Sequence, residues 1–177
     1  MWKGSMIRVA GCFFVIGATT LWGMDKSKRL KSQYEHMKYL QRIICLLKSE
    51  IRYSRSFLGE IFYQIGQSVE EPYRTWLFDL TEKTKNHSAE SFEEIWRESI
   101  DTYLKEIQFS AYEMETLKAL GSQIGFADVE VQLKLLDIYL EHLQKSMEEL
   151  RDEIQTKTKI YHCLGVMSGI LVSVLLL

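Results

Sequence analysis

The chain has 177 residues, of which 46% are apolar and 26% charged, and its formal net charge is −2. This length suits one domain with appendages, and the near-neutral charge excludes a general electrostatic attraction to nucleic acid. The charges are unevenly distributed, because every Asp and Glu lies between Asp25 and Glu153. The two ends of the chain are therefore predominantly apolar.

The first predicted element is the apolar run 6–24, in which Arg8 is the only charged residue. At ~1.5 Å per residue such a helix spans about 28 Å, close to the ~30 Å hydrocarbon core of a bilayer. A buried core helix would normally show a polar face, which this run lacks. A secretory signal is a further alternative, since Lys3 and Arg8 resemble its basic start and Ala18 is small. We favour a transmembrane helix.

Basic residues next to both apolar ends predict the orientation of the chain. Four of them directly follow the first run: Lys26, Lys28, Arg29 and Lys31. Lys157 and Lys159 precede the second run, 161–177, which is about 25 Å long as a helix. Because Lys and Arg hold the flank of a membrane segment in the cytoplasm, we expect a cytoplasmic middle and both termini on the far side.

A long helix is predicted after the first apolar run. Its apolar residues follow a 3-4-3-4 spacing: Met37, Leu40, Ile44, Leu47, Ile51 and Leu58, with Ser54 in register. This stripe is typical of a helix that packs against another helix. The partner is either a helix of the same chain or a second copy, and the first is the more common arrangement.

Shorter helices are predicted in the middle of the chain. Pro72 suits the first turn of a helix in which Trp76, Leu77 and Leu80 face inward, and the polar segment 84–91 is expected to be a loop. Two capping boxes follow, in which a serine side chain and a glutamate three residues later each bind a free backbone N–H. They are formed by Ser91 with Glu94 and by Ser110 with Glu113.

A second long helix is predicted to run into the C-terminal apolar segment. Gly121 and Gly125 indicate the end of the preceding helix through a left-handed conformation, and Asp128 is a candidate cap for the next. The following apolar residues form another 3-4 stripe: Leu133, Leu136, Leu140, Leu143, Met147, Leu150 and Ile154. The sequence thus predicts an all-α protein, an antiparallel helical bundle over 25–160 with long first and last helices, flanked by transmembrane helices at 6–24 and 161–177.

We find no residue pattern typical of catalysis. The four histidines, His36, His87, His142 and His162, include no pair at helical metal-ligand spacing, and Cys12, Cys45 and Cys163 form no CxxC pair. Phosphate-binding loops and the GxSxG nucleophile motif are absent, so the chain should not hydrolyse ATP itself. We expect no metal and no cofactor. An enzyme with an unrecognised site remains the least favoured alternative.

Two carboxylate clusters lie on predicted helices. They are Glu93, Glu94 and Glu98, and Glu148, Glu149, Asp152 and Glu153, with Arg97 and Arg151 interleaved. Such clusters are usually a solvated helix face, and a patch for partner docking is the next alternative.

The C-terminal run contains Gly165 and Gly169, four residues apart. Small residues at this spacing let another transmembrane helix approach closely. The first run offers small residues for such a contact at Gly11, Gly17 and Ala18.

Several segments of the chain form a recognisable set. They are "LKSEIRYSRSFLGEI" (47–61), "IWRESI", and "LGSQIGFADVEVQ" with Gly121, Ile124, Gly125, Asp128 and Gln132 in register, together with the spacing of the tail glycines. Together these segments resemble the stage III sporulation protein AB family over nearly the whole chain. Each motif is weak alone, and their order and spacing are specific. One departure is Phe57, where the family often has proline.

The resemblance implies a membrane protein of the mother cell during spore formation. It implies membership of a secretion-like apparatus between mother cell and forespore, a cytoplasmic domain similar to that of the type II secretion platform protein, and a companion ATPase and other membrane subunits as partners. Candidate docking residues in the family-like segments are Glu50, Arg52, Glu98 and Asp128. The alternative is a membrane-anchored helical scaffold or receptor, unrelated to secretion, that self-associates as a homo-oligomer.

Overall fold

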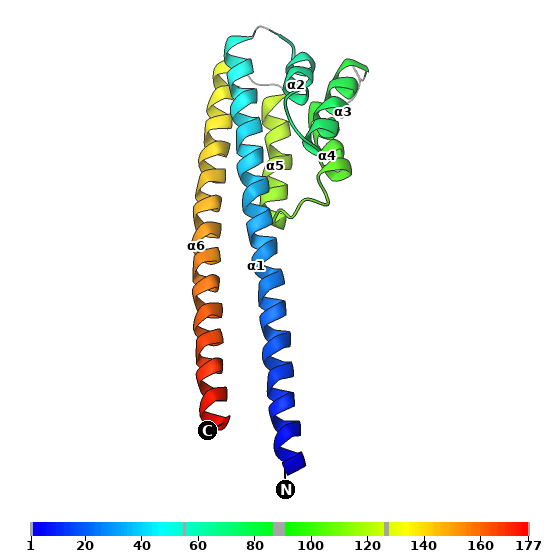
Figure 1. The fold of residues 1–177 in the computed structure, drawn as a ribbon. Helices are drawn as coiled ribbons and strands as arrows, with labels where there is room; N and C mark the ends of the chain where they lie inside the picture. The colour runs from blue at the N-terminus through cyan, green and yellow to red at the C-terminus, as the bar shows by residue number, and fades with distance from the viewer. Residues whose placement is uncertain (1, 55, 87–90, 126–127, 177) are drawn as a thin grey trace. The chain divides into compact units, whose positions relative to one another are not determined.

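The computed structural model describes the backbone of residues 2–54, 56–86, 91–125 and 128–176. Side chains are described from residue 28 onward within these ranges, apart from 158, 161–162, 164–166 and 168–176. All regular secondary structure in these ranges is helical, which confirms the all-α prediction (Figure 1). In chain order the helices are α1 (Trp2–Tyr53), α2 (Leu58–Gly66), α3 (Tyr73–Asn86), α4 (Phe92–Tyr103), α5 (Ala111–Ile124) and α6 (Val129–Leu176).

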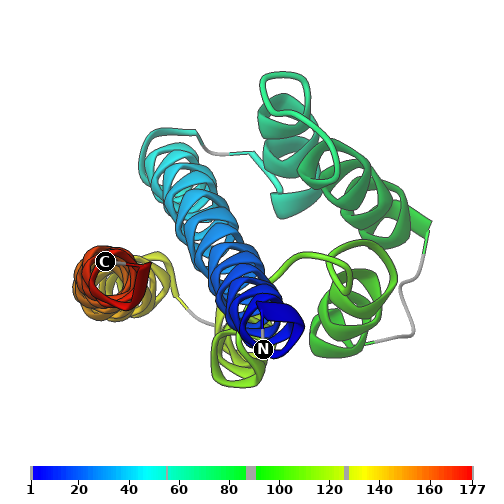
Figure 2. The same cartoon turned by 60° about the horizontal axis from the view of Figure 1, so that its bottom comes forward.

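The chain divides into two compact units. One consists of 1–34 and 148–177, and the other is 35–147, so α1 and α6 each contribute to both. We call 35–147 the helical unit, because it contains the whole of α2 to α5 and most of the buried side chains. Within it, α1 lies between α6 on one side and α2, α3 and α4 on the other (Figures 1 and 2).

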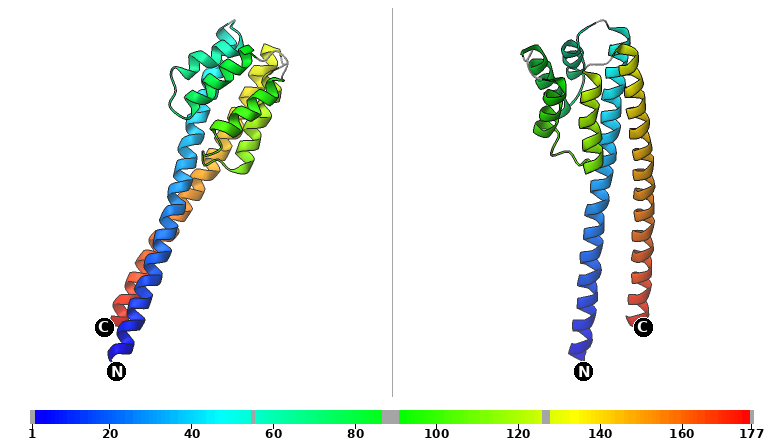
Figure 3. Two further views of the ribbon diagram at one scale, coloured as in Figure 1. Left: turned by 90° about the vertical axis from the view of Figure 1, so that its right-hand side faces the viewer. Right: turned by 180° about the vertical axis from the view of Figure 1, so that it is seen from behind.

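The helical unit holds its parts of α1 and α6 antiparallel, as predicted. Residues 35–53 and 129–147 run side by side in opposite directions, and an ion pair between Lys48 and Asp137 joins them (Figures 1 and 3). The predicted stripes supply the buried faces: Met37, Leu40, Ile44, Leu47 and Ile51 on α1, and Leu136, Leu143 and Met147 on α6. These side chains are buried within one chain, which favours the intramolecular partner over a second copy.

The predicted first stripe is too long, because Ser54 and Leu58 both lie beyond the end of the helix. α1 ends at Tyr53, and Leu58 instead opens α2. Phe57 precedes α2 with φ −68° and ψ 150°, close to the φ that a proline ring imposes. Phe57 therefore keeps the backbone geometry that proline would fix, while its side chain is 89% exposed.

Aromatic rings form the core where α2, α3 and α4 meet. Trp76 and Trp96 lie edge to face with ring centroids 5.1 Å apart, and Phe62 stacks on Phe92 at 6.1 Å. Trp76, Leu77 and Leu80 are all buried, which confirms the predicted inward face of α3. α3 itself continues to Asn86, so the start of the segment predicted as a loop is helical.

Tyr39 and Tyr73 tie α1 to this core. Their rings stack at 5.1 Å, and the Tyr73 hydroxyl donates to the backbone carbonyl of His36 at 3.2 Å. Burial raises the pKa of Tyr73 well above its usual range, so the hydroxyl stays a donor under physiological conditions. The middle helices are thereby held against the first long helix.

Both predicted capping boxes are present. The Ser91 hydroxyl accepts from the backbone N–H of Glu94, and the Glu94 carboxylate accepts from the backbone N–H of Ser91. Ser110 and Glu113 repeat the arrangement at the start of α5. Asp128 immediately precedes α6, where its carbonyl accepts from the backbone N–H of Gln132 at 2.8 Å.

The sequence predicted that Gly121 and Gly125 end a helix in a left-handed conformation, and the predicted conformation is wrong. Gly125 does end α5, but with φ −69°, and none of the described glycines has a positive φ. Gly121 lies inside α5, where a Cβ atom would stand 2.3 Å from Trp96 Cδ1. Its role is to let the indole of α4 pack directly on the α5 backbone.

No helix composed of described residues is long and apolar enough to cross a membrane. The runs 6–24 and 161–177 are helical in backbone up to Leu176, and nearly all of their side chains lie outside the described residues. The predicted transmembrane helices, and the boundaries of the bundle at 25 and 160, stay predictions.

Candidate docking surface

The described residues contain no group of three His, Cys, Asp or Glu side chains that could hold a metal ion. Two histidines are described in the helical unit, and each packs against aromatic rings. His36 lies beside Tyr73 and Phe109, and burial lowers its pKa. His142 lies edge-on to Tyr112 at 5.2 Å, and its Nε2 atom is buried without a hydrogen-bond partner among the described residues. Both described histidines of the helical unit thus pack among aromatic rings.

Glu98, one of the predicted docking residues, belongs to an ion-pair network between α3 and α4. Lys83 Nζ lies 3.1 Å from the Glu98 carboxylate and 3.4 Å from that of Asp79. Burial by itself would lower the pKa of Lys83, but the hydrogen bonds and charges of Glu98 and Asp79 outweigh it and raise the pKa. Asp79 also accepts from the buried Ser99 hydroxyl at 2.6 Å. Glu98 therefore already has a structural partner, although its side chain is 65% exposed.

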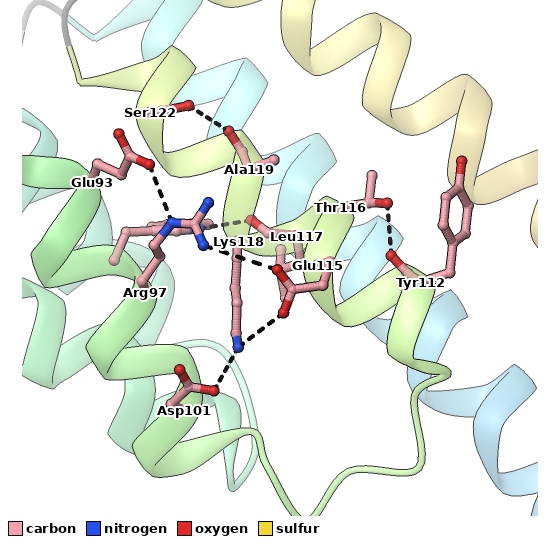
Figure 4. Close-up of polar contacts among 11 residues, drawn as sticks. Glu93, Arg97, Asp101, Tyr112, Glu115, Thr116, Leu117, Lys118, Ala119 and Ser122 are labelled. Carbon is pink, nitrogen blue, oxygen red and sulfur yellow. Dashed lines mark hydrogen bonds and ion pairs between the residues drawn. The ribbon is translucent and has the colours of Figure 1, made fainter.

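A second network joins α4 to α5 (Figure 4). Lys118 Nζ lies 2.7 Å from Asp101 and 3.3 Å from Glu115, and Arg97 binds Glu93 at 3.2 Å and approaches Glu115 at 3.9 Å. The hydrogen bond to Asp101, followed by that to Glu115, outweighs the effect of burial and raises the pKa of Lys118.

These cations on α4 and α5 are matched by carboxylates of the same surface. The nearby Trp96 indole donates to the Leu117 carbonyl at 2.8 Å, so a buried hydrogen bond supports the same contact. Of the predicted carboxylate cluster, Glu93 and Glu98 thus act within the fold, and Glu94 completes a capping box.

Glu50 and Arg52 lie in the last turn of α1, and only Arg52 is exposed. Arg52 lines a hollow of about 250 Å³ with Cys45, Lys48, Ser49, Tyr53 and Leu140 of α6. The start of α6, which follows Asp128, lies at the same end of the helical unit as the end of α1 (Figure 1). The structure thus brings three of the four candidates to one end of the unit and places Glu98 in a different network.

The outer face of α1 carries a row of cations that extends from Arg52 toward Lys38. Lys38, Arg42 and Arg52 are exposed, and none of them makes an ion pair or hydrogen bond with the described residues. A second hollow, of about 390 Å³, is lined by Glu35, Lys38, Tyr39, Gln41, Arg42 and Cys45. Because both hollows include Cys45, they adjoin along one helix face, which we call the basic face (Glu35–Tyr53).

The sequence interpretation missed Lys38 and Arg42. A signal was available, since Lys38, Arg42, Cys45, Ser49 and Arg52 follow a 4-3-4-3 spacing on the opposite side of the helix from the apolar stripe. The same spacing was recognised for the apolar residues of this helix and not for its cations. The residues predicted for transmembrane packing, Gly11, Gly17, Ala18, Gly165 and Gly169, lie among the residues whose side chains are not described.

Fold and site together define an all-helical protein with very long first and last helices and a charged surface over the described residues. The family model described as stage III sporulation protein AB matches residues 8–177. The chain therefore belongs to the stage III sporulation protein AB family.

Individual relatives agree with this assignment. The chain is 25% identical to stage III sporulation protein AB of Bacillus subtilis (strain 168) over 172 residues, covering 97% of this chain and all of the relative. A solved structure of a stage III sporulation protein AB superposes with a TM-score of 0.63 at 21% identity, covering 70% of this chain and 97% of the other. The structural match supports the same helical fold.

Proposed function

We propose that this protein is a non-enzymatic platform subunit in a sporulation-specific, secretion-like complex between mother cell and forespore. In this role it is anchored in the outer forespore membrane, with its helical unit in the mother-cell cytoplasm, and it docks a companion ATPase and other membrane subunits. The observation that carries the proposal is the family match over 8–177, which takes in nearly all of the first apolar run, the helical unit and the second apolar run.

The architecture supports a mechanical role for the helical unit. α1 contains both the apolar run 6–24 and buried residues of the helical unit, and α6 likewise contains buried residues of the unit and the second apolar run up to Leu176. A force applied to the helical unit by an ATPase would be transmitted along these helices to membrane partners. In this role the chain itself carries out no reaction, and the energy comes from the docked ATPase.

Affinity capture tests this function. The tagged full chain is purified from sporulating cells with its membranes, and the captured proteins are identified by mass spectrometry. We expect the ATPase and the membrane subunits of the sporulation complex, and their loss when a non-sporulating culture expresses the same chain. Capture of no ATPase under conditions that retain the membrane subunits would contradict the docking part of the proposal.

The proposed orientation has its own test. A reporter that is active only in the cytoplasm, fused after position 90 of the full chain, should be active. An inactive reporter on an intact fusion would mean that the middle of the chain is exported, and the basic residues beside the apolar runs would then not set the orientation.

The self-associating scaffold is less well supported. It relied on the stripes of α1 and α6, whose side chains Leu40, Ile44, Leu136 and Leu143 are buried inside the helical unit. Cross-linking in membranes that yields only homodimers would nevertheless favour it over the platform role.

A further inference from the structure

We infer that the basic face of α1 is the docking groove of this protein and that it accepts an acidic segment of a partner protein. The inference deepens the proposed function and rests on it for the partner's role, although the chemistry of the groove can be tested without knowing the partner. Of the residues expected to dock a partner, Arg52 lies in this groove and Glu98 does not. Lys38 and Arg42 are further residues of the groove.

The helical unit contains both paired and unpaired cations. Lys83, Arg97 and Lys118 each lie within ion-pair distance of carboxylates in the same unit. Lys38, Arg42 and Arg52 make no contact of this kind with any described residue, although they lie on one helix. Three like charges along one face repel one another. Binding of an anionic surface relieves this repulsion and is favoured by the attraction to each cation.

The basic face is elongated and hollowed. The two adjoining hollows lie along α1 on either side of Cys45, and they include the rings of Tyr39 and Tyr53. From Lys38 to Arg52 the face extends about 21 Å along the helix axis. An elongated segment, such as an amphipathic helix of about four turns, can lie in a groove of this length and contact all three cations.

The order of charges along the basic face favours a protein partner over nucleic acid. Glu35 lies at one end of the face, before Lys38, and Lys48 is already paired with Asp137. A uniformly negative phosphate backbone would meet repulsion at Glu35. A protein segment can place a lysine or arginine opposite Glu35 and carboxylates opposite Lys38, Arg42 and Arg52, which also sets the direction in which it binds.

The test uses the full chain in nanodiscs and a synthetic helical peptide as the probe. The peptide carries one lysine followed by glutamates at the spacing of Lys38, Arg42 and Arg52. We expect it to bind with an affinity that falls as salt rises, and the triple variant K38E/R42E/R52E to bind at least about ten-fold more weakly. The matched control reverses three exposed cations elsewhere in the unit, Lys105, Lys134 and Lys145, and should bind within about two-fold of the unmodified chain.

Two further measurements keep the result interpretable. Circular dichroism must show the same helix content and melting for both triple variants, and the milder K38Q/R42Q variant serves if the charge reversals unfold. Alkylation of the exposed thiol of Cys45, followed by mass spectrometry, should be slowed by the bound peptide, which locates binding at the groove.

Several outcomes would overturn the inference. They are equal binding by the two triple variants, no protection of Cys45, or stronger binding of a single-stranded oligonucleotide than of the acidic peptide. If the groove variants still capture the ATPase from sporulating cells, the groove assignment fails and the platform function stands. If the unmodified chain binds the peptide at the groove but captures no ATPase, the ATPase-docking part of the proposed function fails and the groove assignment stands.

Discussion

On α4 and α5, the cations Arg97 and Lys118 lie between carboxylates of the two helices they join. On the outer face of α1, the cations Lys38, Arg42 and Arg52 lie beside shallow hollows and contact no carboxylate among the described residues. Both surfaces belong to the same helical unit, so solvent and ionic strength act on them alike. The difference indicates that the first set of charges serves the fold and that the second is available to a partner.

The paired charges on α4 and α5 are expected to contribute little to the free energy of unfolding. Surface ion pairs are worth about 0 to 1 kcal/mol each, whereas a buried aromatic side chain contributes several times more. Trp96, which packs on Gly121 and donates to the Leu117 carbonyl, should therefore hold α4 to α5 more strongly than the ion pairs around it.

The largest expected effect is that of Gly121→Val. The first added carbon would stand 2.3 Å from Trp96 Cδ1, so α5 must separate from α4, at a cost of about 3 kcal/mol. Thermal unfolding of the full chain, followed by near-ultraviolet circular dichroism of the tryptophans, measures the change. Gly59→Ala is the control for an added Cβ atom, because its Cβ would meet Thr84 at an ordinary 3.6 Å, and Gly121→Ala allows the same single carbon to be compared at the two sites. Equal melting of the two alanine variants would refute the role of Gly121.

A smaller effect is expected from Trp96→Phe, which removes the hydrogen bond to Leu117 as well as part of the indole. Trp76 provides the comparison, since it is equally buried and its Nε1 has no hydrogen-bond partner among the described residues. Trp96→Phe should destabilise the unit by about 1 kcal/mol more than Trp76→Phe. If denaturant titration gives the reverse order, the hydrogen bond does not contribute as described.

Replacement of Lys118 by methionine should cost up to about 1 kcal/mol, because it leaves Asp101 and Glu115 facing each other without a cation. Lys38→Met should change stability by less than about 0.5 kcal/mol, since Lys38 contacts no carboxylate among the described residues. Both are measured by denaturant titration at low and high salt. A large loss for Lys38→Met would show that the basic face stabilises the fold.

The smallest expected effect is the pH dependence contributed by His36. Burial lowers its folded-state pKa, so between that value and its unfolded value of 6.5 the unfolded state binds more protons. The stabilising contribution of neutral His36 is therefore complete above pH 6.5 and is lost as the pH falls below it. Comparing unfolding of the parent and His36→Gln at about pH 7.5 and about pH 5 isolates this contribution. An unchanged pH dependence in the variant would contradict it.

Much of the helical unit could be predicted from local patterns. The capping boxes of Ser91 and Ser110, and the stripe of α1 from Met37 to Ile51, depend on residues only three or four positions apart. Their geometry is set within a single helix, so the sequence pattern alone is sufficient. The start of α6 could also be predicted from a local pattern, since Asp128 was the candidate cap and α6 begins at the next residue.

Other features depend on contacts between helices. Gly121 resembles a helix end in sequence, because nothing local reveals that Trp96 of another helix packs on it. Glu98 resembles a free carboxylate, because Lys83 reaches it from α3. The basic face shows the same limitation, since the charge of Arg42 is visible in the sequence and its lack of a partner among the described residues is not.

The sequence by itself determined the all-helical class, the starts of α4, α5 and α6, and the inward faces of α1, α3 and α6, because short-range periodicity and capping fix them. Tertiary structure decided which charged side chains form ion pairs and which do not. It also decided that the Trp96 indole packs on Gly121, and that Arg52 and Asp128 lie at the same end of the unit. These depend on distances between helices, which the burial of apolar faces sets only when the whole unit is assembled.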